Sequence, residues 1–227
     1  MIVGGGVIGA SIAYHLTARG ARSVLVLERD VLGAGSTGKN AGGIRQQFSS
    51  EINVRLSQLS LPRFERFEDE FGIDIAFQQV GYLFLITEER DVATFERSLK
   101  LWQRLGVPAH RVEVDEIRSI FPELALDDVL FGTFCHRDGH ADPMSILNGF
   151  VARARAGGAT FREHAAVSGI DLERGRVRAV RVGDERIECD VVIDAAGAWA
   201  PQVGAMVGVD LPIRPLRRDI FVTDGTG

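Results

Sequence analysis

Three glycines near the amino terminus have the spacing of a phosphate-binding loop. Gly4, Gly6 and Gly9 form a G-x-G-x-x-G pattern directly after the apolar residues 1–3. The first glycine permits a tight turn, the second leaves room for a pyrophosphate beside the backbone, and the third lets helix and strand pack closely. Because the pattern alone is common in proteins, its surroundings decide what it means.

The following residues supply those surroundings. Apolar residues recur at helical spacing as far as Gly20, which is placed to end a helix. Residues 23–27 then form an apolar run that predicts a buried strand, and Glu28 follows it directly. Strand, glycines, helix, strand and acid thus occur in the order that a Rossmann unit requires. The alternative interpretation is a glycine-rich turn that binds no ligand.

The chemistry of these residues favours FAD or NAD over NADP. A helix amino end offers unpaired N–H groups and a partial positive charge to a diphosphate. The Glu28 carboxylate can accept hydrogen bonds from the adenosine ribose hydroxyls, and it would repel a 2′-phosphate. The residues predicted to bind the cofactor from this motif are Gly4, Gly6, Val7, Ile8, Gly9, Glu28 and Arg29.

Residues 33–48 form a second glycine-rich stretch. It contains five glycines and few apolar residues, so its composition fits either an ordered loop or a flexible linker. A linker would rarely carry Arg45 and the two glutamines that follow it. We therefore predict an ordered loop at the carboxyl end of the sheet, where ligands bind in open α/β folds, with Ser36 and Thr37 as donors to phosphate.

Hydrophobic periodicity predicts the elements that follow. They are a helix over 51–71 with a kink or break at Pro62, a strand over 81–87, a helix over 91–105, a short helix beginning at Asp115, a strand over 129–135 and a helix from Pro143 to about 157. We expect one apolar face of the first helix to pack on the core, namely Ile52, Leu56, Leu59, Phe64, Phe67 and Phe71.

From residue 160 the pattern changes to short strands with turn signals between them. Residues 166–172, 176–182 and 186–189 predict an antiparallel meander, and 190–197 a buried strand that ends on small residues. A meander inserted into a Rossmann-type sheet is typical of flavin enzymes, by analogy at the level of the fold.

Composition excludes some classes of function. The net charge of −5 and the 25% of charged residues give no basic footprint for nucleic acid, so we expect no nucleic-acid partner. No apolar run is long enough to span a bilayer, and no cleavable leader is recognised. Cys135 and Cys189 lie far apart without metal or dithiol spacing, so we expect structural thiols, no metal site and a cytoplasmic location.

Several separate stretches resemble one family. They are the 4–9 motif with Glu28, the 35–47 loop, Gly81-Tyr82-Leu83, the run from Asp138 to Pro143, and residues 191–199. Together they resemble the flavoproteins of the D-amino acid oxidase superfamily, and within it the sarcosine oxidase and dehydrogenase type. The resemblance implies FAD and the oxidation of a primary or secondary amine by hydride transfer to the flavin, giving an imine that water hydrolyses.

The resemblance also implies a fold and a division into domains. The expected fold is α/β, with a Rossmann-type FAD-binding domain that carries the meander and part of a mixed-sheet α+β substrate domain. Residues 1–76 and 141–210 would form the FAD-binding domain, and residues 77–140 and 211–227 an incomplete substrate domain. Family members continue further, so we expect this chain to be an N-terminal part and its activity alone to be in question.

Further site residues follow from the same resemblance. The implied cofactor contacts are Ser36 and Thr37 at the pyrophosphate or ribityl chain, Ala41, Gly42 and Gly43 beside the isoalloxazine ring, Val167 at the adenine, Ala196 and Gly197 at a second flavin-contacting turn, and Trp199 next to it. No histidine lies in the 33–48 loop, where some relatives attach the flavin covalently. We therefore expect non-covalent FAD.

Arg45 is the candidate for catalysis. A guanidinium near the flavin would stabilise the reduced anion or hold a substrate carboxylate by a paired contact; the alternative is a surface or phosphate-facing arginine. His136 and His140 suggest a metal or a base, yet a turn before a capped helix explains them more simply.

Two other functions remain open from the sequence. One is a flavin dehydrogenase of a 2-hydroxy acid or glycerol phosphate, and the other is a non-catalytic dinucleotide-binding chain. For the leading hypothesis the expected partners are a small amine and an electron acceptor (oxygen or a carrier), and a partner subunit is left open.

Overall fold

The computed structural model describes residues 1–220, and the chain divides into two compact units. Among the described residues, the first comprises 1–41, 71–73 and 143–220, and the second comprises 42–70 and 74–142. Residues 42–70 thus group with the second unit, whereas the sequence-based division placed residues 1–76 together. Residues 221–227 of the expected substrate domain lie outside the described residues.

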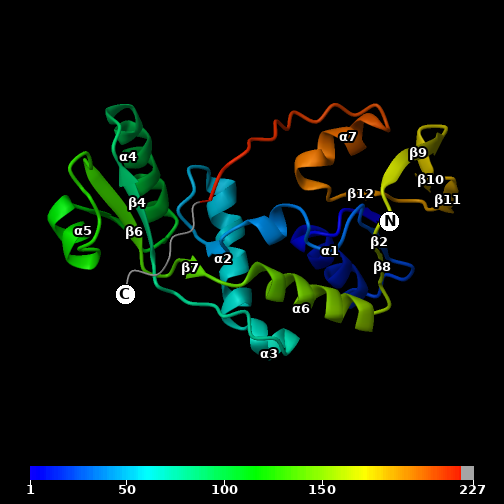
Figure 1. Cartoon of the computed structure of the whole chain (residues 1–227), viewed down its shortest axis with the longest axis horizontal. Helices are drawn as coiled ribbons and strands as arrows, with labels where there is room; N and C mark the ends of the chain where they lie inside the picture. Colours follow the sequence, from blue (N-terminus) through cyan, green and yellow to red (C-terminus); the bar gives the residue numbers. More distant parts are fainter. Residues whose placement is uncertain (221–227) are drawn as a thin grey trace. The chain divides into compact units, whose positions relative to one another are not determined.

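A parallel sheet forms the centre of the first unit (Figure 1). β1 (Ile2–Val3) pairs in parallel with β2 (Leu25–Leu27) and with β12 (Ile193–Asp194), and β2 pairs in parallel with β8 (Thr160–Arg162). The strand order is β12-β1-β2-β8. This is the Rossmann-type arrangement that the glycine motif and the acid after the second strand predict, and the α/β fold class is confirmed.

Two helices of the first unit pack side by side. α1 (Val7–Ala18) begins directly after the glycine motif, and α6 (Pro143–Ala156) begins at the expected proline. Figure 1 shows α6 running along α1. Small buried residues on α1 allow the close approach, and Tyr14 contacts the rings of Phe71 and Phe150. These contacts hold α1 against α6.

The meander follows the parallel sheet. β9 (Val167–Glu173), β10 (Arg176–Val182) and β11 (Glu185–Glu188) form an antiparallel sheet in the order β11-β10-β9, as the turn signals predict. After β12 the chain forms a short 3₁₀ helix η2 (Gly197–Trp199) and helix α7 (Ala200–Ala205). The sequence analysis did not predict α7.

The second unit contains a three-stranded antiparallel sheet. Its order is β4 (Tyr82–Ile86), β6 (Phe131–Cys135) and β5 (Ala109–Val112), and β5 was not predicted. Helices α4 (Glu89–Arg104) and α5 (Val114–Ile120) accompany it. A separate pair joins β3 (Gly43–Ile44) and β7 (Gly139–His140). Trp102 of α4 is buried, and its indole N–H donates to the carbonyl of Phe48 at 2.8 Å.

The helix predicted over 51–71 differs in two respects. α2 (Glu51–Glu65) continues through Pro62 and ends at Glu65, with Arg66 as its C-cap before α3 (Phe67–Phe71). Because Pro62 lies on the exposed side of α2, the carbonyl that loses its partner can be solvated, and no break is needed.

The expected core face of α2 is also wrong in part. Ile52, Leu56 and Leu59 are 64%, 53% and 77% exposed, whereas Val54 and Leu61 are buried. Val54 and Leu61 are seven residues apart and therefore share a face of the helix. Periodicity located an apolar stripe, but it could not show which side of the helix meets the core.

We predict that Gly9→Ala destabilises the first unit. A Cβ at Gly9 would lie 2.0 Å from the carbonyl oxygen of Gly4, which is backbone and cannot move aside as a side chain can. Overpacking of this kind costs about 1–3 kcal/mol. Gly169→Ala is the matched control, because its Cβ would meet only the Arg181 side chain, at 3.7 Å. Urea unfolding measures both changes, and equal stabilities for the two variants would contradict the prediction.

Candidate cofactor site

A cavity of about 600 Å³ lies in the first unit. It opens at the carboxyl ends of β1, β2 and β12, the edge at which open α/β sheets bind ligands. The residues that line it are Val3, Gly4, Gly6, Val7, Ile8, Leu27, Glu28, Arg29, Asp30, Ala34, Gly35, Ser36, Thr37, Lys39, Asn40, Ala165, Ala166, Val167, Ala195, Ala196, Gly197, Ala198, Trp199, Gln202, Val203 and Met206.

The glycine turn brings the amino end of α1 to this cavity. Gly4 has φ of +115°, a conformation that side chains rarely adopt, and its Cβ would lie 2.3 Å from the carbonyl oxygen of Ala195. A Cβ at Gly6 would meet the Thr37 hydroxyl oxygen at 3.1 Å and nothing else within 4 Å. The first-turn N–H groups of a helix have no acceptor within the helix. The turn therefore presents donors and open space to an anionic group.

The 33–48 loop contributes to the same cavity from the other side. Ser36 and Thr37 lie in a short 3₁₀ helix η1 (Ser36–Lys39). The Thr37 hydroxyl accepts the N–H of Val7 at 3.0 Å, and the side-chain amide of Asn40 donates to the carbonyl of Thr37 at 2.6 Å. The loop is thus ordered up to Asn40 and tied to the amino end of α1, which fits a loop that binds phosphate better than a linker.

Glu28 has two roles at the end of β2. Its Oε2 accepts the N–H of Gly5 at 2.7 Å, and its Oε1 accepts the N–H of Asp30 at 3.0 Å. An ionised carboxylate has about four acceptor positions, so both oxygens retain capacity for ribose hydroxyls. The bond to Gly5 also fixes the glycine turn itself, which the sequence spacing did not predict.

Arg29 and Trp199 form one wall of the cavity. The guanidinium carbon of Arg29 lies 3.8 Å from the centroid of the Trp199 ring, a distance typical of a cation–π contact. Trp199 follows Ala196 and Gly197 at the turn after β12, and Val167 begins β9. The carboxylate, the donors of α1 and this flat wall together fit the adenosine diphosphate part of FAD.

The structure distributes the predicted site residues as follows. Those that line the cavity are Gly4, Gly6, Val7, Ile8, Glu28, Arg29, Ser36, Thr37, Val167, Ala196, Gly197 and Trp199. Gly9 packs beneath the turn without lining the cavity, and Ala41 belongs to the same unit but does not line it either. Gly42, Gly43 and Arg45 belong to the second unit.

Sequence reasoning missed part of the lining. Gln202, Val203 and Met206 come from α7 and the residue after it, and Ala165 and Ala166 precede β9. Predicting a helix over residues 200–206 from the sequence would have identified Gln202, Val203 and Met206. Lys39 and Asn40 also line the cavity, and they lie within the predicted loop.

Arg45 occupies an aromatic environment in the second unit. Its guanidinium carbon lies 5.0 Å from the ring centroid of Phe48, 5.3 Å from that of Phe84 and 5.7 Å from that of Tyr82. Arg45 is half-buried, and within residues 1–220 it forms no ion pair with a carboxylate. Its charge is therefore available to an external anion.

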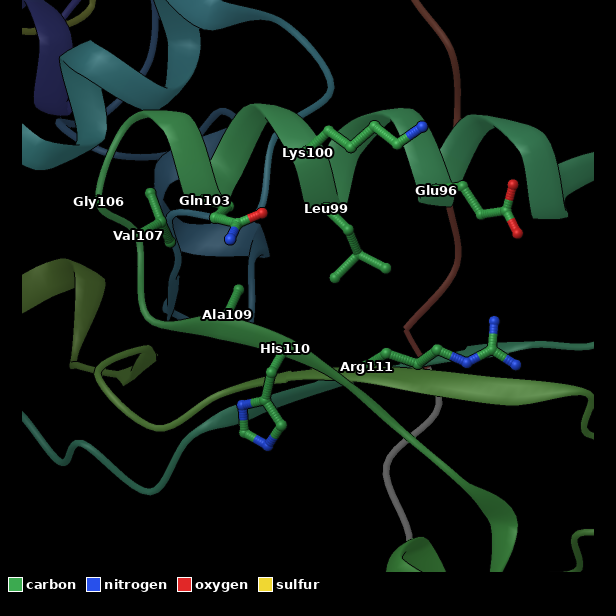
Figure 2. Close-up of a pocket in the computed structure, with 9 residues that line it drawn as sticks. All are labelled: Glu96, Leu99, Lys100, Gln103, Gly106, Val107, Ala109, His110 and Arg111. Carbon is green, nitrogen blue, oxygen red and sulfur yellow. The ribbon is translucent and has the colours of Figure 1, made fainter.

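A second cavity, of about 760 Å³, lies between α4 and β5 of the second unit (Figure 2). Its polar lining residues, among them Glu96, Lys100 and Arg111, are exposed side chains on a surface groove. Its lining includes Gly106 at the carboxyl end of α4, but it has neither a G-x-G-x-x-G turn nor a helix amino end. It is thus the weaker candidate for a dinucleotide.

Metal and membrane features are not found in the described part of the chain. No group of three or more His, Cys, Asp or Glu side chains there is arranged to hold a metal ion. His136 and His140 are exposed on the turn and strand that lead to α6. Among residues 1–220 no helix combines the length and the apolar character needed to cross a bilayer.

Comparison with known proteins assigns the chain to a family. The model of the family described as FAD dependent oxidoreductase (DAO) matches residues 1–227. The chain belongs to this FAD-dependent family, and the resemblance found in the sequence is confirmed.

The chain is similar to enzymes that act on amines and amino acids. It is 32% identical over 224 residues to the mitochondrial dimethylglycine dehydrogenase of Rattus norvegicus, covering 98% of this chain and 26% of that protein. It is 31% identical over 231 residues to the mitochondrial sarcosine dehydrogenase of Mus musculus, covering 99% of this chain and 25% of that protein. The chain therefore spans about a quarter of the length of these relatives.

The fold is also found in a solved structure. L-proline dehydrogenase from P. horikoshii superposes with a TM-score of 0.82 at 34% identity, over 92% of this chain and 55% of that chain. The similarity supports both the parallel sheet and the antiparallel sheets described above.

We predict that Glu28→Gln weakens the binding of FAD. Replacing one carboxylate oxygen by an amide removes charge-assisted acceptor capacity towards Gly5 and the ribose, an interaction worth about 1.5–3 kcal/mol. This corresponds to a rise in Kd of about 10- to 150-fold. Glu188→Gln, on the exposed strand β11, is the control. Calorimetric titration with FAD measures the Kd of both variants. An unchanged Kd for Glu28→Gln would show that Glu28 does not bind the cofactor.

Proposed function

We propose that this chain binds FAD in the cavity of the first unit, and that the protein oxidises a small primary or secondary amine bearing a carboxylate, such as sarcosine. The observation that carries the proposal is the cavity at the sheet edge, with the glycine turn, the amino end of α1 and Glu28 around it. The family membership of the whole chain supports FAD as the ligand. Bound FAD supplies an acceptor for the hydride that leaves the carbon beside the amine nitrogen.

The residues of the first unit bind and orient the cofactor in this proposal. The N–H groups at the start of α1, with Ser36 and Thr37, receive the diphosphate. Glu28 accepts the ribose hydroxyls, Val167 meets the adenine by its backbone, and the wall formed by Arg29 and Trp199 closes one side. Ala41, Ala196 and Gly197 of this unit remain predicted contacts of the flavin. Gly42 and Gly43 remain predicted contacts too, although they belong to the second unit.

Arg45 is our candidate for recognising the carboxylate of the substrate. Its guanidinium lies among three aromatic rings and has no carboxylate partner in the described residues. Aromatic surroundings reduce competition by water and so strengthen a charge-assisted contact. A planar guanidinium can bind a carboxylate through two parallel hydrogen bonds. This supports carboxylated amines as substrates over simple alkylamines.

Two other functions compete with this proposal. A flavin dehydrogenase of a 2-hydroxy acid would use the same cavity, and Arg45 would bind its carboxylate equally well. The names of the relatives, which refer to dimethylglycine, sarcosine and L-proline, favour an amine. A dinucleotide-binding chain without catalysis is the third candidate. A substrate panel separates all three.

The electron acceptor, the partner chain and the compartment are also proposals. Oxygen or a carrier protein would reoxidise the flavin, and a second subunit could complete the enzyme. Both cysteines are free thiols, which supports the reducing, cytoplasmic compartment expected from the sequence, although the two dehydrogenases named above are mitochondrial. Cell fractionation of the producing organism decides between these compartments.

We predict that FAD quenches the fluorescence of Trp199. The chain has two tryptophans, Trp199 in the wall of the cavity and Trp102 buried in the second unit. Titration with FAD should lower the emission of the unmodified chain and of Trp102→Phe. The Trp199→Phe variant should lose most of the quenching while keeping its Kd for FAD within about threefold. Full quenching in Trp199→Phe would place the cofactor elsewhere.

We predict that sarcosine bleaches the flavin absorbance under anaerobic conditions. A panel of sarcosine, dimethylglycine, L-proline, lactate and glycerol 3-phosphate tests the class of substrate. Reduction by the secondary amines sarcosine and L-proline, and not by lactate or glycerol 3-phosphate, is expected, while dimethylglycine shows whether a tertiary amine is also accepted. Reduction by lactate or glycerol 3-phosphate alone would favour the hydroxy-acid alternative, and bound flavin that no substrate reduces would favour the non-catalytic one.

A further inference from the structure

Asp138 is a buried acid that the proposed function does not use. Its side chain is fully buried within the second unit. No ion pair involves it in the part of the chain that the structure describes. A buried carboxylate without a countercharge is costly unless hydrogen bonds satisfy it, so its neighbours need a specific explanation.

Donors from the 33–48 loop surround this carboxylate. Its Oδ1 accepts the backbone N–H of Gln46 at 3.0 Å and the Gln46 side-chain amide at 3.4 Å. Its Oδ2 accepts the side-chain amide of Gln47 at 3.3 Å. Both glutamines are themselves buried. All three contacts are N–H donors, which matches an ionised carboxylate, since that group only accepts hydrogen bonds.

Gln47 extends the network to two strands of the sheet. Its side-chain amide also donates to the carbonyl of Tyr82 in β4 at 2.8 Å. Its Oε1 accepts the hydroxyl of the fully buried Thr133 in β6 at 2.8 Å. The side chain of Gln47 thus has partners at both ends, and it links the loop to β4, to β6 and to Asp138.

Electrostatics agree with this arrangement. Burial raises the pKa of Asp138, while its hydrogen bonds with Cys135, Gln47 and Gln46 act in the opposite direction. Burial, followed by the negative charge of Asp138, raises the pKa of the Cys135 thiol to about 12. The acid therefore lies in a region of low dielectric, where a hydrogen bond to it is stronger than the same bond would be in water.

Arg45 lies between two anchored segments. On its amino side, Gly43 and Ile44 pair with β7. On its carboxyl side, Gln46 and Gln47 are bound to Asp138, which directly precedes β7. Residues 138–140 thus contact the chain on both sides of Arg45, and Tyr82 and Thr133 add further partners for Gln47.

We propose that Asp138 is a positioning residue, which holds Gln46 and Gln47 and thereby fixes where Arg45 presents its guanidinium to the carboxylate of the substrate. The proposal rests on the proposed function for the role of Arg45. The geometric part, that Asp138 orders residues 43–48, stands independently and has its own test.

The first test is amide hydrogen exchange in Asp138→Asn. Asparagine keeps one oxygen, so at least one of the two glutamines faces an NH₂ group and loses its acceptor. Exchange across residues 43–48 should become at least about tenfold faster, while the rest of the second unit stays protected. Asp128→Asn, an exposed acid of the same unit, should change nothing. Gln46→Met, which removes one side-chain donor to Asp138 and keeps the backbone N–H donor of residue 46, is the milder second variant should Asp138→Asn not fold. Unchanged exchange in the variants that fold would overturn the proposal.

The second test measures anaerobic flavin reduction as a function of sarcosine concentration. Asp138→Asn should raise the apparent Kd for sarcosine at least about tenfold and leave the limiting rate of reduction within about threefold. In Arg45→Lys, the further change Asp138→Asn should add little, because both residues act on one contact. If the double variant raises the apparent Kd for sarcosine by the product of the two separate increases, Asp138 does not act through Arg45.

The two tests fail in different ways. If no amine reduces the flavin of the unmodified protein, the proposed function has failed, and the exchange experiment still decides whether Asp138 orders the loop. The other outcome is that amines reduce the flavin, but Asp138→Asn impairs a simple alkylamine as much as it impairs sarcosine, both in limiting rate and in apparent affinity. In that case the positioning role is wrong and the proposed function stands.

Discussion

The close contact between the β1–α1 turn and the end of β12 is the constraint on which the cofactor site depends. A Cβ at Gly4 would lie 2.3 Å from the carbonyl oxygen of Ala195, and one at Gly9 would lie 2.0 Å from that of Gly4. Side chains at either position would push α1 away from the sheet. With glycine there, the amino end of α1 stays at the sheet edge, and Glu28 secures the turn through the N–H of Gly5. The same contacts that build the core thus create the anion site.

The second unit holds a charged side chain, that of Arg45, in a defined position. Arg45 is surrounded by aromatic rings, and its neighbours in the chain are held by a strand pair and by the buried Asp138. The cost of burying a carboxylate is offset by three N–H donors. Ordering the loop in advance would reduce the entropy lost when a ligand binds.

Local patterns made much of the fold predictable. The turn after β1, the helix that follows it, the acid after β2 and the meander each depend on residues close together in the sequence. The face of α2 was wrong because Ile52, Leu56 and Leu59 are apolar yet exposed, and burial depends on which distant segment covers the helix. β5 and the second role of Glu28 were missed for the same reason, since their partners are remote. α7 was missed because it is only 6 residues long and gives little periodicity to detect. Asp138 and the two glutamines are 91 and 92 residues apart, and no spacing rule joins them.

The visible absorption spectrum of the purified chain, taken after incubation with FAD and removal of free cofactor, tests the central claim most directly. Our account predicts flavin absorbance bands with close to one FAD for each chain, released on unfolding because the cofactor is not covalently attached. A colourless protein after the same treatment would contradict the account, because the cavity at the sheet edge would then not be a cofactor site.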